Sequence, residues 1–162
     1  MGNLPQSSNS PSHQKTIFKK TPLVVIIPDA FLDHCHWHDI SFAKYLKAAG
    51  YGHYAPLSPA HQNFNKVTAD KNMRHIRKKV LLHLLKRDDR DIVLVMHGYS
   101  SVVASAAAKG LSKAERVKQG KRAGIIGQIF IAGLLMKGGN NVSVKDAFGS
   151  SYPPLCPDEV RM

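Results

Sequence analysis

Four short apolar segments alternate with segments of helical character, and this alternation restricts the possible folds more than any other feature of the chain. The apolar segments lie at residues 22–27, 51–59, 91–96 and 124–135. The first and third are rich in β-branched residues, which is typical of strands buried on both faces of a parallel sheet. Strands that alternate with helices at this spacing favour β-α-β crossovers. The sequence therefore predicts an α/β fold: a doubly wound, mainly parallel sheet of about four strands in the order second, first, third, fourth, with helices on both faces.

Three segments have the apolar spacing of helices packed on such a sheet. The first covers residues 37–49 and ends at Gly50. The second follows Thr68, a suitable N-cap, with Asp70 in its first turn. The third covers residues 99–110. The apolar faces expected of the first two helices consist of Trp37, Ile40, Phe42, Tyr45 and Leu46, and of Met73, Ile76, Val80, Leu81, Leu84 and Leu85.

The predicted domain covers residues 22–140, between a flexible basic N-terminal tail at 1–21 and an irregular C-terminal segment at 141–162. The tail has no apolar run of signal-peptide length. The longest apolar stretch, residues 124–136, has 13 residues, fewer than the roughly 20 that span a bilayer, so no membrane span is expected. Cys35 and Cys156 are the only cysteines, which disfavours a disulfide framework and indicates a cytoplasmic protein.

The chain is strongly basic, with 23 Lys and Arg against 11 Asp and Glu and a net charge of +12. Such a charge favours contact with anionic partners without naming one. The sequence has two main clusters of positive residues: Lys71, Arg74, Arg77, Lys78, Lys79 and Arg87, and Lys113, Arg116, Lys118, Lys121 and Arg122. No nucleic-acid motif or aromatic stacking platform accompanies them, so we interpret both as solvated surface and expect no specific nucleic-acid partner.

The segment DIVLVMHGYSSVVASAAAKG, residues 91–110, joins a buried strand to a small-residue helix through a sharp turn. Together with VVIIPDAF, FAKYLKAAGYGHYAPLSP and KAERVKQGKRAGIIGQIFIAGLL, in this order, it resembles the α/β-hydrolase superfamily, specifically its esterase and hydroxynitrile-lyase-like branch. The resemblance covers about residues 22–140. It implies a truncated, partial α/β-hydrolase fold, in which the turn after the third strand is the nucleophile elbow.

The resemblance also assigns roles to individual residues of that turn. The nucleophilic serine of the family falls on Gly98, and the backbone N–H groups of Tyr99 and Ala30 match the two oxyanion donors. Ser100 and His97 are the remaining catalytic candidates, although helical geometry directs the side chain of Ser100 away from the elbow tip.

No histidine follows Gly98, so the family's order of nucleophile, acid and base is not present in this chain. We therefore expect a catalytically compromised homologue, or a module that binds a small carbonyl or ester ligand or a protein. A second copy or another protein would cover the edge of the fourth strand. The alternative is an active hydrolase or a carbonyl-processing lyase or isomerase, for example of secondary metabolism, with a non-standard site. Neither interpretation requires a cofactor.

One further motif, DHCHWHD at residues 33–39, places His34, His36 and His38 on one side of an extended segment. Structural zinc sites usually need a fourth ligand and a different spacing. In the resembling family a variable polar loop lies here, so we expect no metal site.

Overall fold

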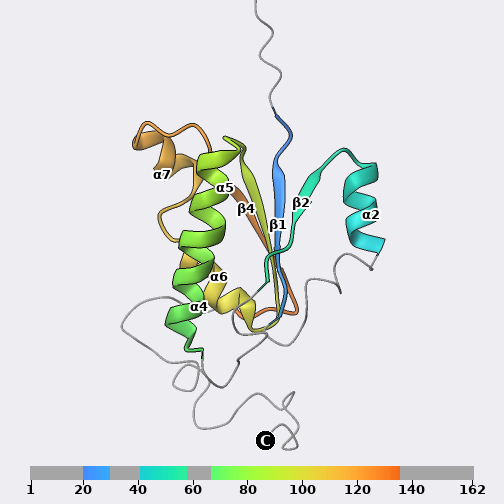
Figure 1. The fold of residues 1–162 in the computed structure, drawn as a ribbon, viewed down its shortest axis with the longest axis vertical. Coiled ribbons are helices and arrows are strands. Elements are labelled where there is room, and N and C mark those ends of the chain that lie inside the picture. The colour runs from blue at the N-terminus through green and yellow to red at the C-terminus, as the bar shows by residue number, and fades with distance from the viewer. Residues whose placement is uncertain (1–19, 30–40, 58–66, 136–162) are drawn as a thin grey trace, which may run out of the picture.

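The computed structural model describes residues 20–29, 41–57 and 67–135 (Figure 1). The elements in chain order are β1 (Leu23–Ile27), α2 (Ser41–Ala48), β2 (Gly52–Tyr54), α4 (Ala69–His75), η2 (Ile76–Leu81), α5 (Leu82–Arg87), β3 (Ile92–His97), α6 (Ser100–Ala108), α7 (Lys113–Lys118) and β4 (Ile125–Ile131). The helices and strands alternate as the apolar pattern predicts.

The four strands form one sheet in the order β2-β1-β3-β4, and every pairing is parallel. The predicted fold class and strand order are confirmed. β1 and β3 occupy the centre, where Leu23 lies beside Ile92 and Ile27 beside Met96. All five residues of β1 are buried, as expected of a strand with a neighbour on each edge and side chains packed on both faces.

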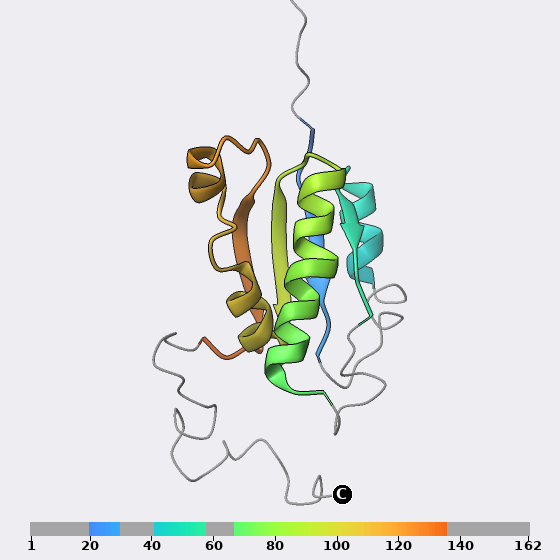
Figure 2. The same ribbon diagram turned by 60° about the vertical axis from the view of Figure 1, so that its left-hand side comes forward.

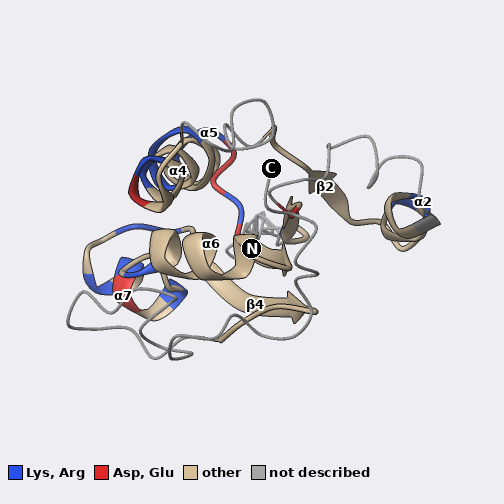
Figure 3. Ribbon diagram, turned by 90° about the horizontal axis from the view of Figure 1, so that it is seen from below, with Lys and Arg blue, Asp and Glu red and all other residues tan. Residues whose placement is uncertain are grey.

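Helices lie on both faces of the sheet but cover them unequally (Figures 1 and 3). α4, η2, α5 and α6 pack on one face, here called the α6 face, where they enclose the larger apolar core with Val25, Leu94 and Met96. α2 packs on the opposite face, the α2 face, where Phe42 and Leu46 meet Val24, Ile26 and Val95. Alternate residues of each central strand therefore enter different cores.

α4, η2 and α5 follow one another without interruption and form one long helical rod beside the sheet (Figure 2). Thr68 caps it as predicted, since its Oγ1 accepts a hydrogen bond from the Lys71 N–H at 3.3 Å. The predicted apolar stripe is confirmed: Ile76, Val80, Leu81, Leu84 and Leu85 are buried and Met73 packs against them. The π-helical geometry of η2 was not predicted, because it changes the hydrogen bonding without changing the apolar pattern. No helix among the described residues is both long enough and apolar enough to cross a bilayer.

The second strand is shorter than the sequence indicated, and the structure describes only part of the predicted first helix. α2 begins at Ser41, while Trp37 and Ile40 lie outside the described residues. Tyr45, expected on the apolar face, is 71% exposed, because Phe42 and Leu46 on one helical ridge already fill the contact with the sheet. The second strand is limited to Gly52–Tyr54.

α7 was not predicted, although its start carries a recognisable signal. Ser112 and Glu115 form a capping box, in which each side chain accepts a hydrogen bond from the other's backbone N–H. The expectation that Arg116 is solvated surface was wrong. Arg116 is buried and its Nε donates to the Ala123 carbonyl, which lies two residues before β4.

A second group of contacts holds α7 against the sheet. Lys113 Nζ bonds Asp91 Oδ1 at 2.8 Å, and that oxygen also accepts the Gly124 N–H at 3.0 Å. Since Asp91 precedes β3 and Gly124 precedes β4, these bonds and that of Arg116 attach α7 to the entry of both strands.

The core contacts of the long helix can be tested by comparing two leucines. Leu81 is fully buried in the larger core, whereas Leu57 is 48% exposed. We expect Leu81→Ala to lower the free energy of unfolding by about 2–5 kcal/mol, because the cavity cannot fully collapse. Leu57→Ala should change it by less than about 0.5 kcal/mol. Urea unfolding followed by circular dichroism measures both, and equal effects would contradict the assigned core.

Candidate functional site

The candidate site is the turn between β3 and α6, formed by His97, Gly98 and Tyr99. Gly98 has a φ of +54°, in the left-handed region that glycine adopts without strain. Its N–H donates to the Ile131 carbonyl at 3.1 Å, which ties the turn to the end of β4. Tyr99 is the N-cap residue of α6. The structure therefore places Gly98 in a tight strand-to-helix turn, as the sequence predicts.

The carboxylate of Asp29 lies directly against this turn. Asp29 follows β1, the strand paired with β3, and its Oδ1 accepts a hydrogen bond from the Tyr99 N–H at 3.1 Å. A Cβ atom added to residue 98 would overlap the same carboxylate, at 2.6 Å from its Cγ. Asp29 therefore occupies the space into which a side chain at position 98 would project.

The position of this carboxylate has an electrostatic basis. The first N–H groups of α6 have no acceptor within the helix and carry its positive partial charge. A carboxylate that accepts from one of them satisfies a backbone donor and interacts favourably with the helix dipole. The Tyr99 N–H, which the resemblance assigns as an oxyanion donor, is thus already bonded to an internal anion. The Tyr99 side chain packs against the larger core, and burial raises the pKa of its phenol.

The two serines after the turn face the interior of the protein. Ser101 is buried; its Oγ donates to the Gly98 carbonyl at 2.7 Å and accepts the Leu134 N–H at 2.8 Å. Ser101 therefore joins the turn to the segment that follows β4. Ser100 is also buried, and its Oγ has no hydrogen-bond partner among the described residues. Both serine side chains are therefore shielded from solvent.

Of the other candidate residues, the structure describes only His97. His97 ends β3 and is partly buried. Ala30, the second proposed oxyanion donor, lies outside the described residues, as do His34, His36 and His38. In the part of the chain that the structure describes, no three His, Cys, Asp or Glu side chains are grouped so as to hold a metal ion.

The chain matches no protein-family model, no curated protein and no solved structure. The α/β fold is therefore established by the strand order and pairing alone. The α/β-hydrolase resemblance remains a prediction from the four sequence segments.

Asp29 is the residue of this site to which the sequence analysis gave no role. A signal was present, because Asp29 stands two residues after β1 and Gly98 two residues after Met96, the register partner of Ile27. The carboxyl ends of adjacent parallel strands meet at one edge of a sheet. Combining the predicted strand order with this rule would have placed Asp29 beside Gly98.

The overlap between position 98 and Asp29 can be measured with a double-mutant cycle. Gly98→Ala should lower the free energy of unfolding by about 1–3 kcal/mol, from the left-handed φ and from the displaced carboxylate. In an Asp29→Ala background only the backbone strain remains, so the cost of Gly98→Ala should fall by about 0.5 kcal/mol or more. Urea unfolding of the four proteins gives this coupling. An unchanged cost would show that the carboxylate does not occupy the side-chain space of residue 98.

The neighbouring serines provide a matched pair for a second test. Ser101→Ala leaves the Leu134 N–H without its acceptor and should lower the free energy of unfolding by about 1–3 kcal/mol. Ser100→Ala removes a buried hydroxyl that has no described partner and should be neutral within about 0.5 kcal/mol or stabilising. Thermal unfolding followed by circular dichroism compares the two. A larger loss for Ser100→Ala than for Ser101→Ala would contradict the assigned hydrogen bonds.

Proposed function

We propose that this protein is an α/β-hydrolase-like chain that does not hydrolyse esters and acts by binding. The observation that carries the proposal is the position of the Asp29 carboxylate, bonded to the Tyr99 N–H and filling the side-chain space of residue 98. In the family that the sequence resembles, that space holds the nucleophile and that N–H stabilises the oxyanion. In this chain the Asp29 carboxylate fills the space of the nucleophile and accepts the hydrogen bond of the oxyanion donor.

The chemistry of acyl transfer supports the absence of turnover. The reaction needs an attacking atom and hydrogen-bond donors aimed at the developing oxyanion. Gly98 offers no side-chain atom. A carboxylate on the Tyr99 N–H competes for that donor and repels negative charge beside it. A carbonyl ligand would have to displace Asp29 before it could use this amide.

The burial of the neighbouring hydroxyls weighs against a substitute nucleophile. Ser100 and Ser101 are both fully buried. The Ser101 hydroxyl also hydrogen-bonds the backbone of Gly98 and of Leu134. A substrate could reach neither without opening the N-terminus of α6. The alternative of an active hydrolase or lyase therefore draws no support from these two residues.

A binding function in the cytoplasm agrees with the remaining features. Two isolated cysteines in 162 residues are typical of a reducing compartment. Without a catalytic site at this turn, the protein would act through its surface. We expect its binding partner to be another protein.

This proposal predicts the behaviour of the purified chain towards serine-directed reagents. The wild-type protein should not label with a fluorophosphonate and should not hydrolyse p-nitrophenyl esters above the uncatalysed rate. Gly98→Ser should not restore either activity, because its Cβ overlaps the Asp29 carboxylate and that negative charge opposes the oxyanion.

Ser100→Ala and His97→Ala are the informative controls for this assay. Turnover by the wild-type chain that either substitution abolishes would overturn the proposal in favour of a non-standard active site. Labelling of Gly98→Ser at an esterase-like rate would show that the oxyanion donors remain usable.

A further inference from the structure

β4 is an edge strand of the sheet that the described residues form. Its inner side pairs with β3, and on the outer side the described residues contribute only a bridge between Ser112 and Ile125 at its start. Ile126 and Ile129 are 48% and 49% exposed. The backbone from 126 to 131 therefore presents a row of donors and acceptors to whatever lies beside it.

The two edges of the sheet differ in protection. β2 has three residues, is followed shortly by Pro56 and has α2 beside it (Figure 1). β4 has seven residues, and no Asp, Glu, Lys or Arg occurs from 124 to 135. Natural edge strands are usually kept apart by short length, charge or proline. β4 carries none of these three features, and its one register irregularity, where Ile92 pairs with Ile125 and Val93 with Gly127, leaves residues 127–131 in regular register.

The side chains of β4 divide between the two faces of the sheet. Ile129 pairs with Val95 and Ile131 packs with it, so both lie on the α2 face. Phe130 packs against the larger core, so Phe130 and Gln128 lie on the α6 face. α2 lies beside β2, at the far side of the sheet from β4 (Figure 3). Ile129 is half exposed, and no described helix lies over it on the α2 face.

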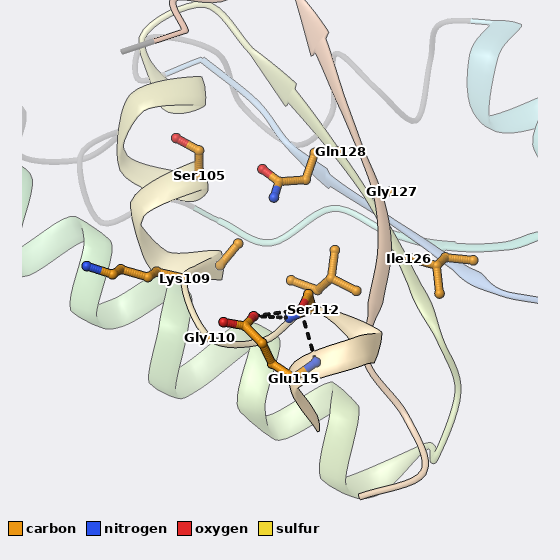
Figure 4. Close-up of a pocket in the computed structure, with 10 residues that line it drawn as sticks. Ser105, Lys109, Gly110, Ser112, Glu115, Ile126, Gly127 and Gln128 are labelled. Carbon is orange, nitrogen blue, oxygen red and sulfur yellow. Dashed lines mark hydrogen bonds between the residues drawn. The ribbon is translucent and has the colours of Figure 1, made fainter. Parts of the chain in front are cut away.

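A groove of about 480 Å³ runs along β4 on the α6 face, between the end of α6 and the start of α7. Its lining includes Ser105, Ala108, Ser112 and Gln128. Figure 4 shows Gln128 on the same side of the strand as Ser105, and Ile126 on the opposite side. The edge is therefore accompanied by space into which a side chain of an added strand can extend.

We propose that β4 pairs antiparallel with β4 of a second copy of this chain, with the two-fold axis at Ile129. Ile129 then faces its own equivalent, Gln128 faces Phe130 and Gly127 faces Ile131. Each pair has both members on one face of the sheet, as antiparallel pairing requires. A Cβ added at Gly127 would meet nothing within 4 Å, so the space beside it can receive Ile131 of the second copy. Phe130 of the second copy lies next to the groove at Gln128.

The charge distribution favours a second copy over an acidic partner. Two chains of +12 repel each other unless they meet where neither carries charge, and β4 provides such a surface. Many of the Lys and Arg residues lie on the long helix and α7 (Figure 3), and the two charged residues that line the groove beside the first half of β4, Lys109 and Glu115, are of opposite sign. An acidic protein would be attracted to the Lys and Arg residues of the helices instead. This inference rests on β4 alone and does not depend on the absence of turnover at Gly98.

Sedimentation of the full chain tests the pairing. The wild type should dimerise, and raising the salt from about 0.05 M to about 0.5 M should strengthen the dimer, because salt screens the repulsion between like charges. Ile129→Lys should raise the dimer Kd by about 100-fold or more, since it sets two like charges against each other at the axis. Tyr54→Lys, which adds the same charge on the opposite edge, should leave the dimer intact. A monomeric wild type, or a dimer that survives Ile129→Lys, would overturn the proposal.

A crosslink tests the register. In a background of Cys35→Ser and Cys156→Ser, Ile129→Cys should form a disulfide-linked dimer on mild oxidation, because directly opposed residues have the Cα separation that a disulfide requires. Tyr54→Cys should remain monomeric on a non-reducing gel. Crosslinking of Tyr54→Cys, or none for Ile129→Cys, would contradict pairing about Ile129.

Discussion

The parallel pairing of β1 with β3 is the interaction on which the rest of this structure depends. Five register pairs join the two strands, and Val25, Ile26, Leu94 and Met96 have no exposed surface. Their alternate side chains supply the centre of both apolar cores, so α2 on one face and the long helix on the other pack against the same pair of strands. Because the strands are in register, the residues that follow them emerge together, and Asp29 arrives beside Gly98.

The contact between Asp29 and the turn at Gly98 changes the chemistry that this turn can support. A strand-to-helix turn at the carboxyl edge of a parallel sheet presents backbone N–H groups to an incoming group, and many enzymes use it for that reason. In this chain the group that accepts from the turn is the Asp29 carboxylate of the protein itself. The absence of a side chain at Gly98 and the presence of the Asp29 carboxylate are complementary, since either a larger residue at 98 or a ligand on the Tyr99 N–H would require the carboxylate to move.

The sequence predicted the features that depend on local pattern. The buried strands followed from uninterrupted apolar runs, the stripe from Ile76 to Leu85 followed from helical spacing, and the turn at Gly98 followed from its position between a strand and a small-residue helix. The features that were missed depend on distant partners. Burial of Arg116 requires the Ala123 carbonyl, and the role of Asp29 requires the N-terminus of α6. Neither partner can be identified from composition or periodicity around the charged residue itself.

The two edges of the described sheet limit strand pairing in different ways. At β2 the strand is short, Pro56 follows it and α2 lies alongside, so the shape of the molecule limits pairing. β4 is longer and contains no proline, and the charge that opposes association is located on the helices rather than on the strand. Charge on the helices acts over a distance of about 8–10 Å in physiological salt, whereas strand pairing acts over about 5 Å. Repulsion therefore opposes the approach of two copies from most directions, while the proposed edge-to-edge pairing along β4 brings together two strands without Asp, Glu, Lys or Arg.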